Sequence, residues 1–317
     1  MTAPVLPPEI DAVRSAARDE ASGVLTDPIE TDATAEPGRP SRRSSIARLF
    51  ARERRPSWTL VLAVAVVVIA VLWALVPWAF TGYDPIDGVP AEKLQPPSLE
   101  HWFGTDAIGR DLYAGVVYGA VHSLSGALIA VTVGLAAGTL IGVVAGSVGG
   151  IVDDILMRIV DVLLSIPGLL LMLSVIILLG FGTVNAAIAV GVVSVASFAR
   201  LSRSEVVRVR RSDYVEAAFG SGGTFISVLR RHVLPNSLTA VIGLAALQFG
   251  TAILAISTLG FLGYGAPPPT PEWGLLIAEG RNYVATAWWL TTLPGLVVLV
   301  VVLSANRISQ SLGRSSR

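Results

Sequence analysis

The chain has 317 residues, of which 53% are hydrophobic, 15% are charged, and the formal net charge is zero. Soluble domains carry roughly a quarter of their residues as charged groups, so a single soluble core is excluded and part of this apolar surface must face lipid. The absence of cysteine excludes disulfide bonds, cysteine-bound metals and thiol nucleophiles. No glycine-rich loop precedes the lone lysine, Lys93, which excludes a P-loop nucleotide site.

Residues 1–56 precede the first apolar stretch, and residues 1–40 are rich in Pro, Ala, Thr, Asp and Glu. This composition predicts a disordered cytoplasmic tail. Seven arginines lie between Arg39 and Arg55, where they predict a juxtamembrane anchor that contacts anionic lipid headgroups. We therefore divide the chain into a tail, 1–56, and a transmembrane domain, 57–317.

Six stretches reach or approach the roughly 20 apolar residues that a membrane-spanning helix needs. The first begins after 56 residues and has full length, which predicts a retained helix rather than a signal peptide. The sequence thus predicts an all-α integral membrane protein with six transmembrane helices. The stretches are 57–80, 123–146, 155–180, 184–203, 238–262 and 286–305.

Arginine and lysine residues are distributed unequally between the loops. If the N-terminus is cytoplasmic, the inner segments hold 20 of these residues and the outer segments, 81–121 and 263–285, hold 3. Basic residues accumulate on the cytoplasmic side of membrane proteins. We therefore expect both termini in the cytoplasm. The chain shows no basic groove with interleaved aromatic residues, so we expect no nucleic-acid partner.

The second stretch carries four glycines at four-residue spacing, which places them on one face of a helix. Glycine lets a neighbouring helix approach closely in a membrane. We interpret this stripe as internal packing, with an interface to a partner subunit as the alternative. The four residues are Gly134, Gly138, Gly142 and Gly146.

Polar residues within the apolar stretches are few. Arg158 and Asp161 lie three residues apart, which predicts a structural ion pair on one helix face, with a role in gating as the alternative. In the fifth stretch, Gln248, Thr251 and Ser257 either line a solute pathway or form hydrogen bonds between helices. The sequence favours neither reading.

The segment between the fourth and fifth stretches, residues 211–236, predicts two short helices joined by a glycine turn. Asp213 is placed to cap the first helix, and Gly222 permits the turn. The second helix is expected over 224–233 and is expected to end at Pro235. A compact unit of this kind, seated in a cleft of another protein, transmits that protein's motion to the spans.

This segment resembles the EAA loop of bacterial ABC importer permeases. That loop has Glu-Ala-Ala, three residues, Gly, nine residues and Ile-x-Leu-Pro. At the same spacing the chain has Glu216-Ala217-Ala218, Gly222 and Leu234-Pro235, with His232 at the isoleucine position. The dipeptide/oligopeptide/nickel branch of the family usually has histidine there.

Two further segments are similar to the outward segments of the same branch. Residues 101–111 read HWFGTDAIGRD, and residues 260–281 contain GFLGYG, PPPTPEWG and EGR. The first segment resembles that of the C-type subunit. Its Asp106, Arg110 and Asp111 either form a local network, which we favour because two glycines indicate a compact turn, or contact a binding protein.

The resemblance implies which residues contact an ATP-binding subunit. Arg230 and Arg231 are explained equally well as positive-inside anchors. The implied coupling residues are Tyr214, Glu216, Ala217, Ala218, Gly222, Arg230, Arg231, Leu234 and Pro235.

The resemblance also implies the type I ABC importer permease fold and a multi-pass location in the bacterial cell (inner/plasma) membrane. The expected partners are a B-type permease, two ATP-binding subunits, an extracytoplasmic solute-binding protein and membrane lipid. ATP and Mg are expected in the ATP-binding subunits, whereas this chain is expected to bind no cofactor or metal and to have no catalytic residue. The expected function is ATP-driven import, with peptides as the expected solute.

Two other classes of membrane protein predict different sequence features. An ion-gradient-driven secondary transporter is expected to show internal repeats and buried ionisable residues, and we find no convincing set. An intramembrane enzyme needs a nucleophile with a base, or metal ligands. His122 and His232 lie near opposite ends of their expected helices and have no evident partners in the sequence.

Overall fold

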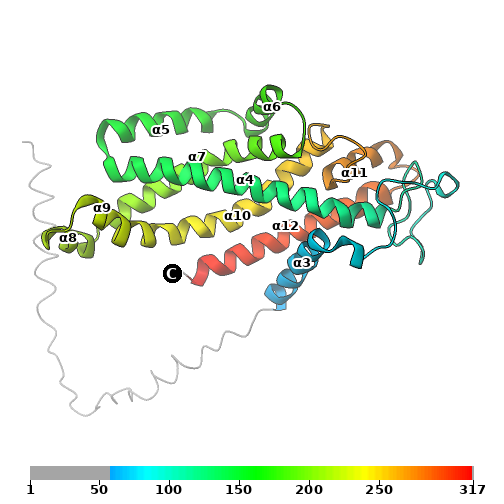
Figure 1. The fold of residues 1–317 in the computed structure, drawn as a ribbon, viewed down its shortest axis with the longest axis horizontal. Helices are drawn as coiled ribbons and strands as arrows, with labels where there is room; N and C mark the ends of the chain where they lie inside the picture. Colours follow the sequence, from blue (N-terminus) through cyan, green and yellow to red (C-terminus); the bar gives the residue numbers. More distant parts are fainter. Residues whose placement is uncertain (1–57, 316–317) are drawn as a thin grey trace, which may run out of the picture. The chain divides into compact units, whose positions relative to one another are not determined.

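The computed structural model describes residues 58–315, with side chains described as far as residue 311. The tail predicted for residues 1–56 lies outside this range. Within it the chain is helical, without strands apart from one isolated bridge between Thr105 and Asp111. The long elements in Figure 1 are α3 (Trp58–Leu75), α4 (Leu112–Val148), α5 (Gly150–Ser165), α6 (Gly168–Leu179), α7 (Thr183–Arg210), α10 (Leu234–Phe261) and α12 (Trp289–Ser315).

The shorter elements gather at the two ends of these helices (Figure 1). One end carries α8 (Asp213–Gly220) and α9 (Phe225–Val228), followed by a π-helical turn, η3 (Leu229–Val233). We call it the α8–α9 end. The other, the α11 end, carries the segment between α3 and α4 and the helix α11. Its elements are η1 (Pro77–Ala79), η2 (Pro90–Glu92), α11 (Trp273–Gly280) and η4 (Arg281–Tyr283).

Five described helices are long and apolar enough to cross a membrane. They are α3, α4, α7, α12 and the continuous run from α9 through α10. All five overlap spans predicted from the sequence, and α4, with 37 residues, and α7, with 28, extend well beyond the predicted bounds. The cytoplasmic position of both termini rests on the arginine distribution and stays a prediction.

The third predicted span, 155–180, is not one straight helix. It is divided between α5 and α6, which meet at an angle of 98°. Ile166 is extended, with φ −85° and ψ 130°, and Pro167 precedes α6. A residue before proline avoids the helical region, which explains the break. The described part therefore has six spans only if the bent pair is counted as one.

The predicted ion pair between Arg158 and Asp161 does not form among the described residues. Asp161 accepts a hydrogen bond from Arg200 of α7 at 2.7 Å instead. Arg203 of α7 donates two hydrogen bonds, each of 2.5 Å, to Asp153. Two of the three acids of α5 therefore pair with α7, which lies alongside it.

The glycine stripe of α4 packs against α7, which confirms internal packing. A Cβ atom added at Gly138 would lie 2.5 Å from the carbonyl oxygen of Val195. One added at Gly142 would lie 2.4 Å from the carbonyl oxygen of Ala199. These distances are below van der Waals contact, so only glycine allows the two backbones to come this close.

We expect Gly142→Ala to destabilise the chain and Gly243→Ala to stabilise it slightly. The added methyl group at Gly142 meets backbone atoms of α7, and overpacking of this kind costs about 1–3 kcal/mol. Gly243, in α10, has no atom within 4 Å of its added Cβ, and alanine is the better helix former. Thermal unfolding in detergent compares the variants, and equal midpoints would contradict this account of the packing.

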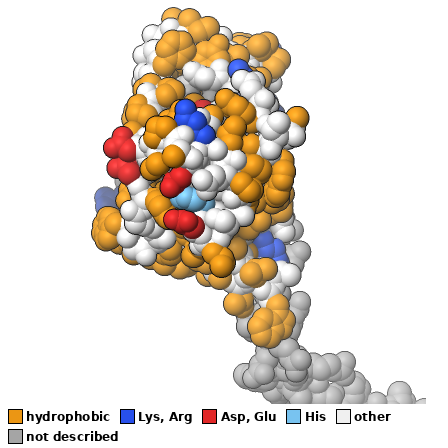
Figure 2. Space-filling view, turned by 90° about the vertical axis from the view of Figure 1, so that its right-hand side faces the viewer, with side chains coloured by type: hydrophobic (Ala, Val, Ile, Leu, Met, Phe, Trp, Pro, Cys, Tyr) orange, Lys and Arg blue, Asp and Glu red, His pale blue; other side chains and the backbone are white. Residues whose placement is uncertain are grey.

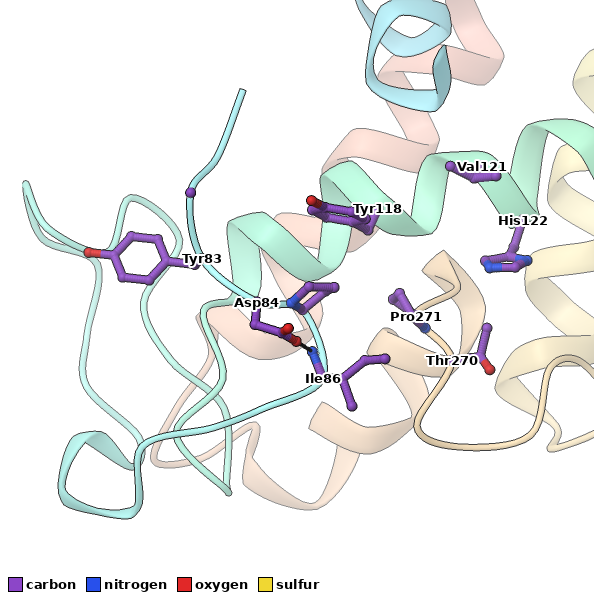
Figure 3. A pocket seen from close by; sticks show the side chains of 10 residues that line it. Tyr83, Asp84, Ile86, Tyr118, Val121, His122, Thr270 and Pro271 are labelled. Carbon is purple, nitrogen blue, oxygen red and sulfur yellow. Dashed lines mark hydrogen bonds between the residues drawn. The ribbon is translucent and has the colours of Figure 1, made fainter. Parts of the chain in front are cut away.

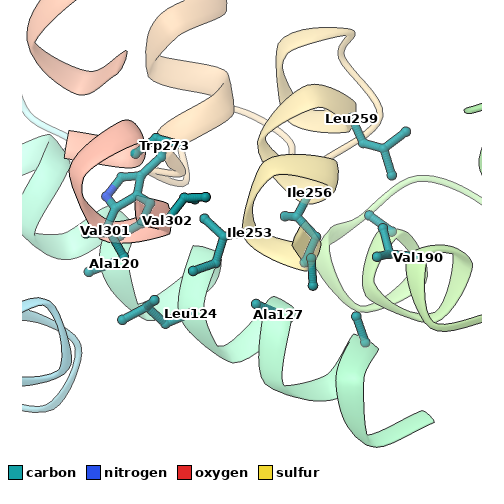
Figure 4. Packing of buried hydrophobic residues seen from close by; sticks show 14 of the residues in the cluster. Ala120, Leu124, Ala127, Val190, Ile253, Ile256, Leu259, Trp273, Val301 and Val302 are labelled. Carbon is teal, nitrogen blue, oxygen red and sulfur yellow. The ribbon is translucent and has the colours of Figure 1, made fainter. Parts of the chain in front are cut away.

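The buried core lies between α4, α7, α10 and α12, as Figure 4 shows. Ile253 and Ile256 of α10 point toward α4, where alanine residues leave room for them. Trp273, from the start of α11, enters this core and is fully buried. The short helix α11 is therefore fixed to the membrane-spanning helices by its first residue.

Candidate functional site

The α8–α9 end is built around a small core of its own. Val215 of α8 and Val228 of α9 are buried together with Val206 and Val209 of α7 and Val233 of η3. This core is separate from the main one. It holds the two short helices against the last turns of α7, so that α8, α9 and the end of α7 form one packed unit.

Two neighbouring glycines join α8 to α9 for different reasons. Gly222 has φ +86°, in the left-handed region that favours glycine. Gly223 has no room for a side chain, because an added Cβ would lie 2.6 Å from the carbonyl oxygen of Ala218. The backbone N–H of Gly223 donates to that same oxygen at 3.0 Å. The predicted turn at Gly222 is thus present, and the sequence reasoning missed the steric role of Gly223.

The predicted coupling residues all lie at this end. Ala218 and Leu234 are half-buried and the other seven are exposed. Aromatic and aliphatic side chains lie exposed among them, including Phe225 and Ile226, and Ile226 is 74% exposed. Large apolar side chains exposed together on one short segment are typical of a site of protein–protein contact.

Two details of the predicted segment are wrong. Ser212, not Asp213, precedes the first turn of α8, and its hydroxyl donates to the carbonyl of Val209 rather than capping the helix. Pro235 does not end the second helix. Pro235 lies in the first turn of α10, where a missing backbone N–H is tolerated. The wider π turn of η3, immediately before it, keeps the helix continuous.

At the α11 end, the three charged residues predicted as a network divide into two groups. Asp106 accepts hydrogen bonds from the side chain of Arg110 at 2.5 Å and from its backbone N–H at 2.9 Å. Arg110 also donates to Glu279, near the end of α11, at 2.7 Å. These bonds connect the segment before α4 to the segment after α10.

Asp111 has a different set of partners. One oxygen caps α4 by accepting the backbone N–H of Ala114 at 2.7 Å, and the other lies 2.8 Å from Nδ1 of the buried His101. The compact turn expected here is present, because Gly109 has φ +87° and no space for a Cβ atom. In Figure 2, acidic side chains gather around a histidine on this end of the molecule.

Glu272 is a buried acid that the sequence reasoning missed. Its side chain is fully buried, and Oε2 accepts the backbone N–H of Ala266 at 3.3 Å. Its Oε1 atom has no hydrogen-bond partner among the described residues. Burial raises the pKa of Glu272 to about 7, against the opposing effect of the backbone N–H groups of Ala266 and Gly274. In the sequence, the position of this acid between Pro271 and Trp273 was the feature that could have indicated its burial.

The residues around Glu272 form a wedge between α4 and α10. Cβ atoms added at Gly260 and Gly265 would lie 2.5 and 2.2 Å from its carboxyl oxygens. The indole N–H of Trp273 donates to the carbonyl of Val116 in α4 at 2.9 Å. Residues 272–274, which we call the wedge, therefore fix the end of α10 against the start of α4.

Two of the three pathway candidates on α10, Gln248 and Thr251, lie together, and Ser257 does not join them. Thr251 is exposed and donates a hydrogen bond to the carbonyl of Gln248 at 2.9 Å. Ser257 is buried instead, beneath Gly274 of the wedge. Gln248 and Thr251 share an accessible region, whereas Ser257 faces the interior of the chain.

The helices are arranged as in solved structures of ABC transporters. The structure is similar to the MetNI methionine ABC transporter in an inward-facing conformation, with a TM-score of 0.53 and 17% identity over 64% of this chain and 96% of that one. It is also similar to an amino acid ABC transporter crystallised with histidines, with a TM-score of 0.52 and 15% identity over 64% and 95%.

Residues 138–317 match the model of the binding-protein-dependent transport system inner membrane component, and the chain belongs to this family. It is 41% identical to the dipeptide transport system permease DppC of Alkalihalophilus pseudofirmus, over 70% of this chain and 73% of the relative. It is 39% identical to the probable D,D-dipeptide permease DdpC of Escherichia coli K12, over 78% and 83%. For the glutathione permease GsiD of E. coli O6:K15:H31 the identity is 37%, over 82% and 86%.

These comparisons confirm the resemblance drawn from the EAA loop. The chain is a multi-pass permease subunit of an ATP-driven ABC importer in the inner membrane, and it is not an enzyme. The predicted six-helix permease fold is confirmed, with five long helices and the bent pair α5–α6 counted as the sixth span.

Proposed function

We propose that this chain imports short peptides as the C-type half of a permease pair, together with a B-type permease. The peptide assignment is supported by relatives named for dipeptide, D,D-dipeptide and glutathione transport. Two ATP-binding subunits hold the ATP and Mg and perform the hydrolysis, while this chain binds neither. A solute-binding protein delivers the peptide from outside the membrane.

The observation that carries this proposal is the packed unit at the α8–α9 end. Its exposed residues, which include Glu216, Arg230 and Arg231, form the docking surface for an ATP-binding subunit. Because the valine core joins α8 and α9 to α7, movement of the docked subunit is transmitted into a membrane-spanning helix. The seven basic residues between positions 200 and 236 support a cytoplasmic location for this end.

The α11 end is then extracytoplasmic and faces the solute-binding protein. The pair of Arg110 with Asp106 and Glu279 joins the two segments that form this surface. In the membrane, Gln248 and Thr251 are the pathway candidates that the structure leaves accessible, whereas Ser257 has a packing role.

The test is purification of the tagged chain from its native membrane in a mild detergent, followed by mass spectrometry and an ATPase assay. We expect a second permease and ATP-binding subunits to co-purify, with ATPase activity that rises when a peptide-loaded binding protein is added. ATP-dependent uptake of a radiolabelled dipeptide into proteoliposomes completes the test.

Two results would contradict the proposal. If the stable chain elutes without an ATP-binding partner, the EAA loop has no coupling role, and an ion-gradient-driven secondary transporter becomes the leading alternative. If the partners co-purify but no peptide raises ATPase activity or enters proteoliposomes, the importer assignment stands and the peptide assignment is wrong.

A further inference from the structure

A pocket of about 530 Å³ opens at the α11 end, next to the start of α4. Three segments far apart in the sequence form it: the loop 82–86, one face of α4 from Tyr118 to His122, and Thr270 with Pro271 just before the wedge. Small-molecule sites range from about 300 to 1,000 Å³, so the volume fits a ligand of dipeptide size. Figure 3 shows the side chains that line it.

At one side of the pocket, Asp84 provides a fixed negative charge. Its Oδ1 atom accepts the backbone N–H groups of Ile86 at 2.7 Å and of Asp87 at 3.0 Å. These two hydrogen bonds lower the pKa of the Asp84 carboxyl, which therefore stays ionised at neutral pH. Among the described residues Asp84 forms no ion pair, and Oδ2 accepts no hydrogen bond. The carboxylate is held in place and retains a free oxygen.

The other side of the pocket provides hydrogen-bond donors. In Figure 3, His122 lies close to Thr270, and Pro271 lies between them and Asp84. The side chains of Tyr118, His122 and Thr270 have no hydrogen-bond partner among the described residues. An ionisable side chain on a membrane-spanning helix without a partner indicates a functional site.

We propose that this pocket receives a short peptide, with the peptide's ammonium group at Asp84 and its carboxylate at His122 and Thr270. This inference rests on the proposed function, and it assigns the pocket as the place where the peptide first contacts this chain. A charged hydrogen bond to Asp84 is stronger than a neutral one, and Ile86 and Val121 supply apolar surface for the peptide's side chains. A protein loop inserted here has neither free terminus.

The first test is a labelling experiment, for which the absence of cysteine in the chain is an advantage. Ile86→Cys places a thiol on the pocket wall, and Val89→Cys places a matched thiol outside it. The two native side chains are 45% and 50% exposed. The complete transporter in nanodiscs is treated with a water-soluble maleimide, with and without millimolar dialanine, and N-acetyl-dialanine amide serves as the ligand that lacks both charges.

We expect dialanine to slow labelling of the Ile86→Cys chain several-fold and to leave the Val89→Cys chain unaffected. The doubly blocked peptide gives no protection, and adding Asp84→Asn to Ile86→Cys removes the protection by dialanine. Equal labelling with and without dialanine overturns the proposal, as does equal protection by the blocked peptide. The latter result indicates an uncharged occupant, such as a loop of the binding protein.

The second test uses uptake. With saturating binding protein, Asp84→Asn is expected to reduce dialanine uptake about tenfold, the usual size of one lost charged hydrogen bond. The neighbouring Asp87→Asn, whose side chain lies outside the pocket, keeps wild-type uptake. If wild type takes up peptide and Asp84→Asn takes it up equally well, the assignment of the pocket as a peptide site is wrong and the proposed function stands. If wild type takes up no peptide, the proposed function itself fails.

Discussion

Replacing Gly222 by proline strongly reduces peptide uptake while the chain still inserts into the membrane. Gly222 has φ +86°, whereas proline fixes φ near −65°. Proline also removes the backbone N–H that donates to the carbonyl of Phe219 at 2.9 Å. The turn between α8 and α9 therefore cannot form, and we expect uptake to fall by more than about tenfold because the docking surface is lost. Uptake into proteoliposomes and the ATPase rate measure this effect.

A matched control separates coupling from folding. Gly220→Ala lies two residues away, at a glycine without positive φ and with no atom within 4 Å of an added Cβ, and is expected to transport normally. Glu216→Lys reverses an exposed charge on the same surface without changing the backbone, and it is expected to lose uptake while ATP hydrolysis becomes insensitive to loaded binding protein. Normal uptake by both Gly222→Pro and Glu216→Lys would remove the coupling assignment.

Replacing Glu272 by glutamine makes the chain more stable than wild type at pH 8, and no more stable at pH 4.5. Burial raises the pKa of Glu272 from 4.5 to about 7. Because the folded pKa is the higher one, the wild-type chain loses stability as pH rises from about 4.5 to about 7, and the loss persists above that range. A shift of about 2.5 units corresponds to roughly 3 kcal/mol.

The measurement is the difference in unfolding temperature between wild type and Glu272→Gln across this pH range, since other carboxyl groups affect both chains alike. Glu272→Lys serves as the opposite extreme. It places a long cation against Gly260 and Gly265, where no space remains for additional atoms, and it is expected to prevent stable folding at every pH. A pH-independent difference between wild type and the glutamine variant would show that Glu272 does not titrate in the folded chain.

The sequence predicted those features that depend on local pattern. Spans of apolar residues and glycines four residues apart correspond directly to helices and to one close helix pair, because both depend on residues on the same face. The EAA spacing located the α8–α9 end for the same reason. Gly222 was identified because a positive φ is a property of a single residue.

Features that depend on contacts between distant segments were missed. Asp161 was assigned to Arg158, its neighbour along the helix, whereas α7 brings Arg200 to it. The burial of Glu272 depends on two glycines, one of them in another helix, and on the position of Trp273. Pro235 was expected to end a helix, but the helix continues through it because the preceding residue, Leu234, is itself helical. The residue before Pro167, Ile166, is extended instead.

The close glycine packing of α4 on α7 has a mechanical consequence. Four successive contacts prevent these helices from sliding or separating, so they turn together as one lever. At about 1.5 Å per residue, the 28 residues of α7 reach about 42 Å, and a tilt of about 5° moves its far end by nearly 4 Å. A small movement of the docked ATP-binding subunit thereby produces a larger displacement at the opposite end of α7. That displacement is comparable to the width of a peptide backbone.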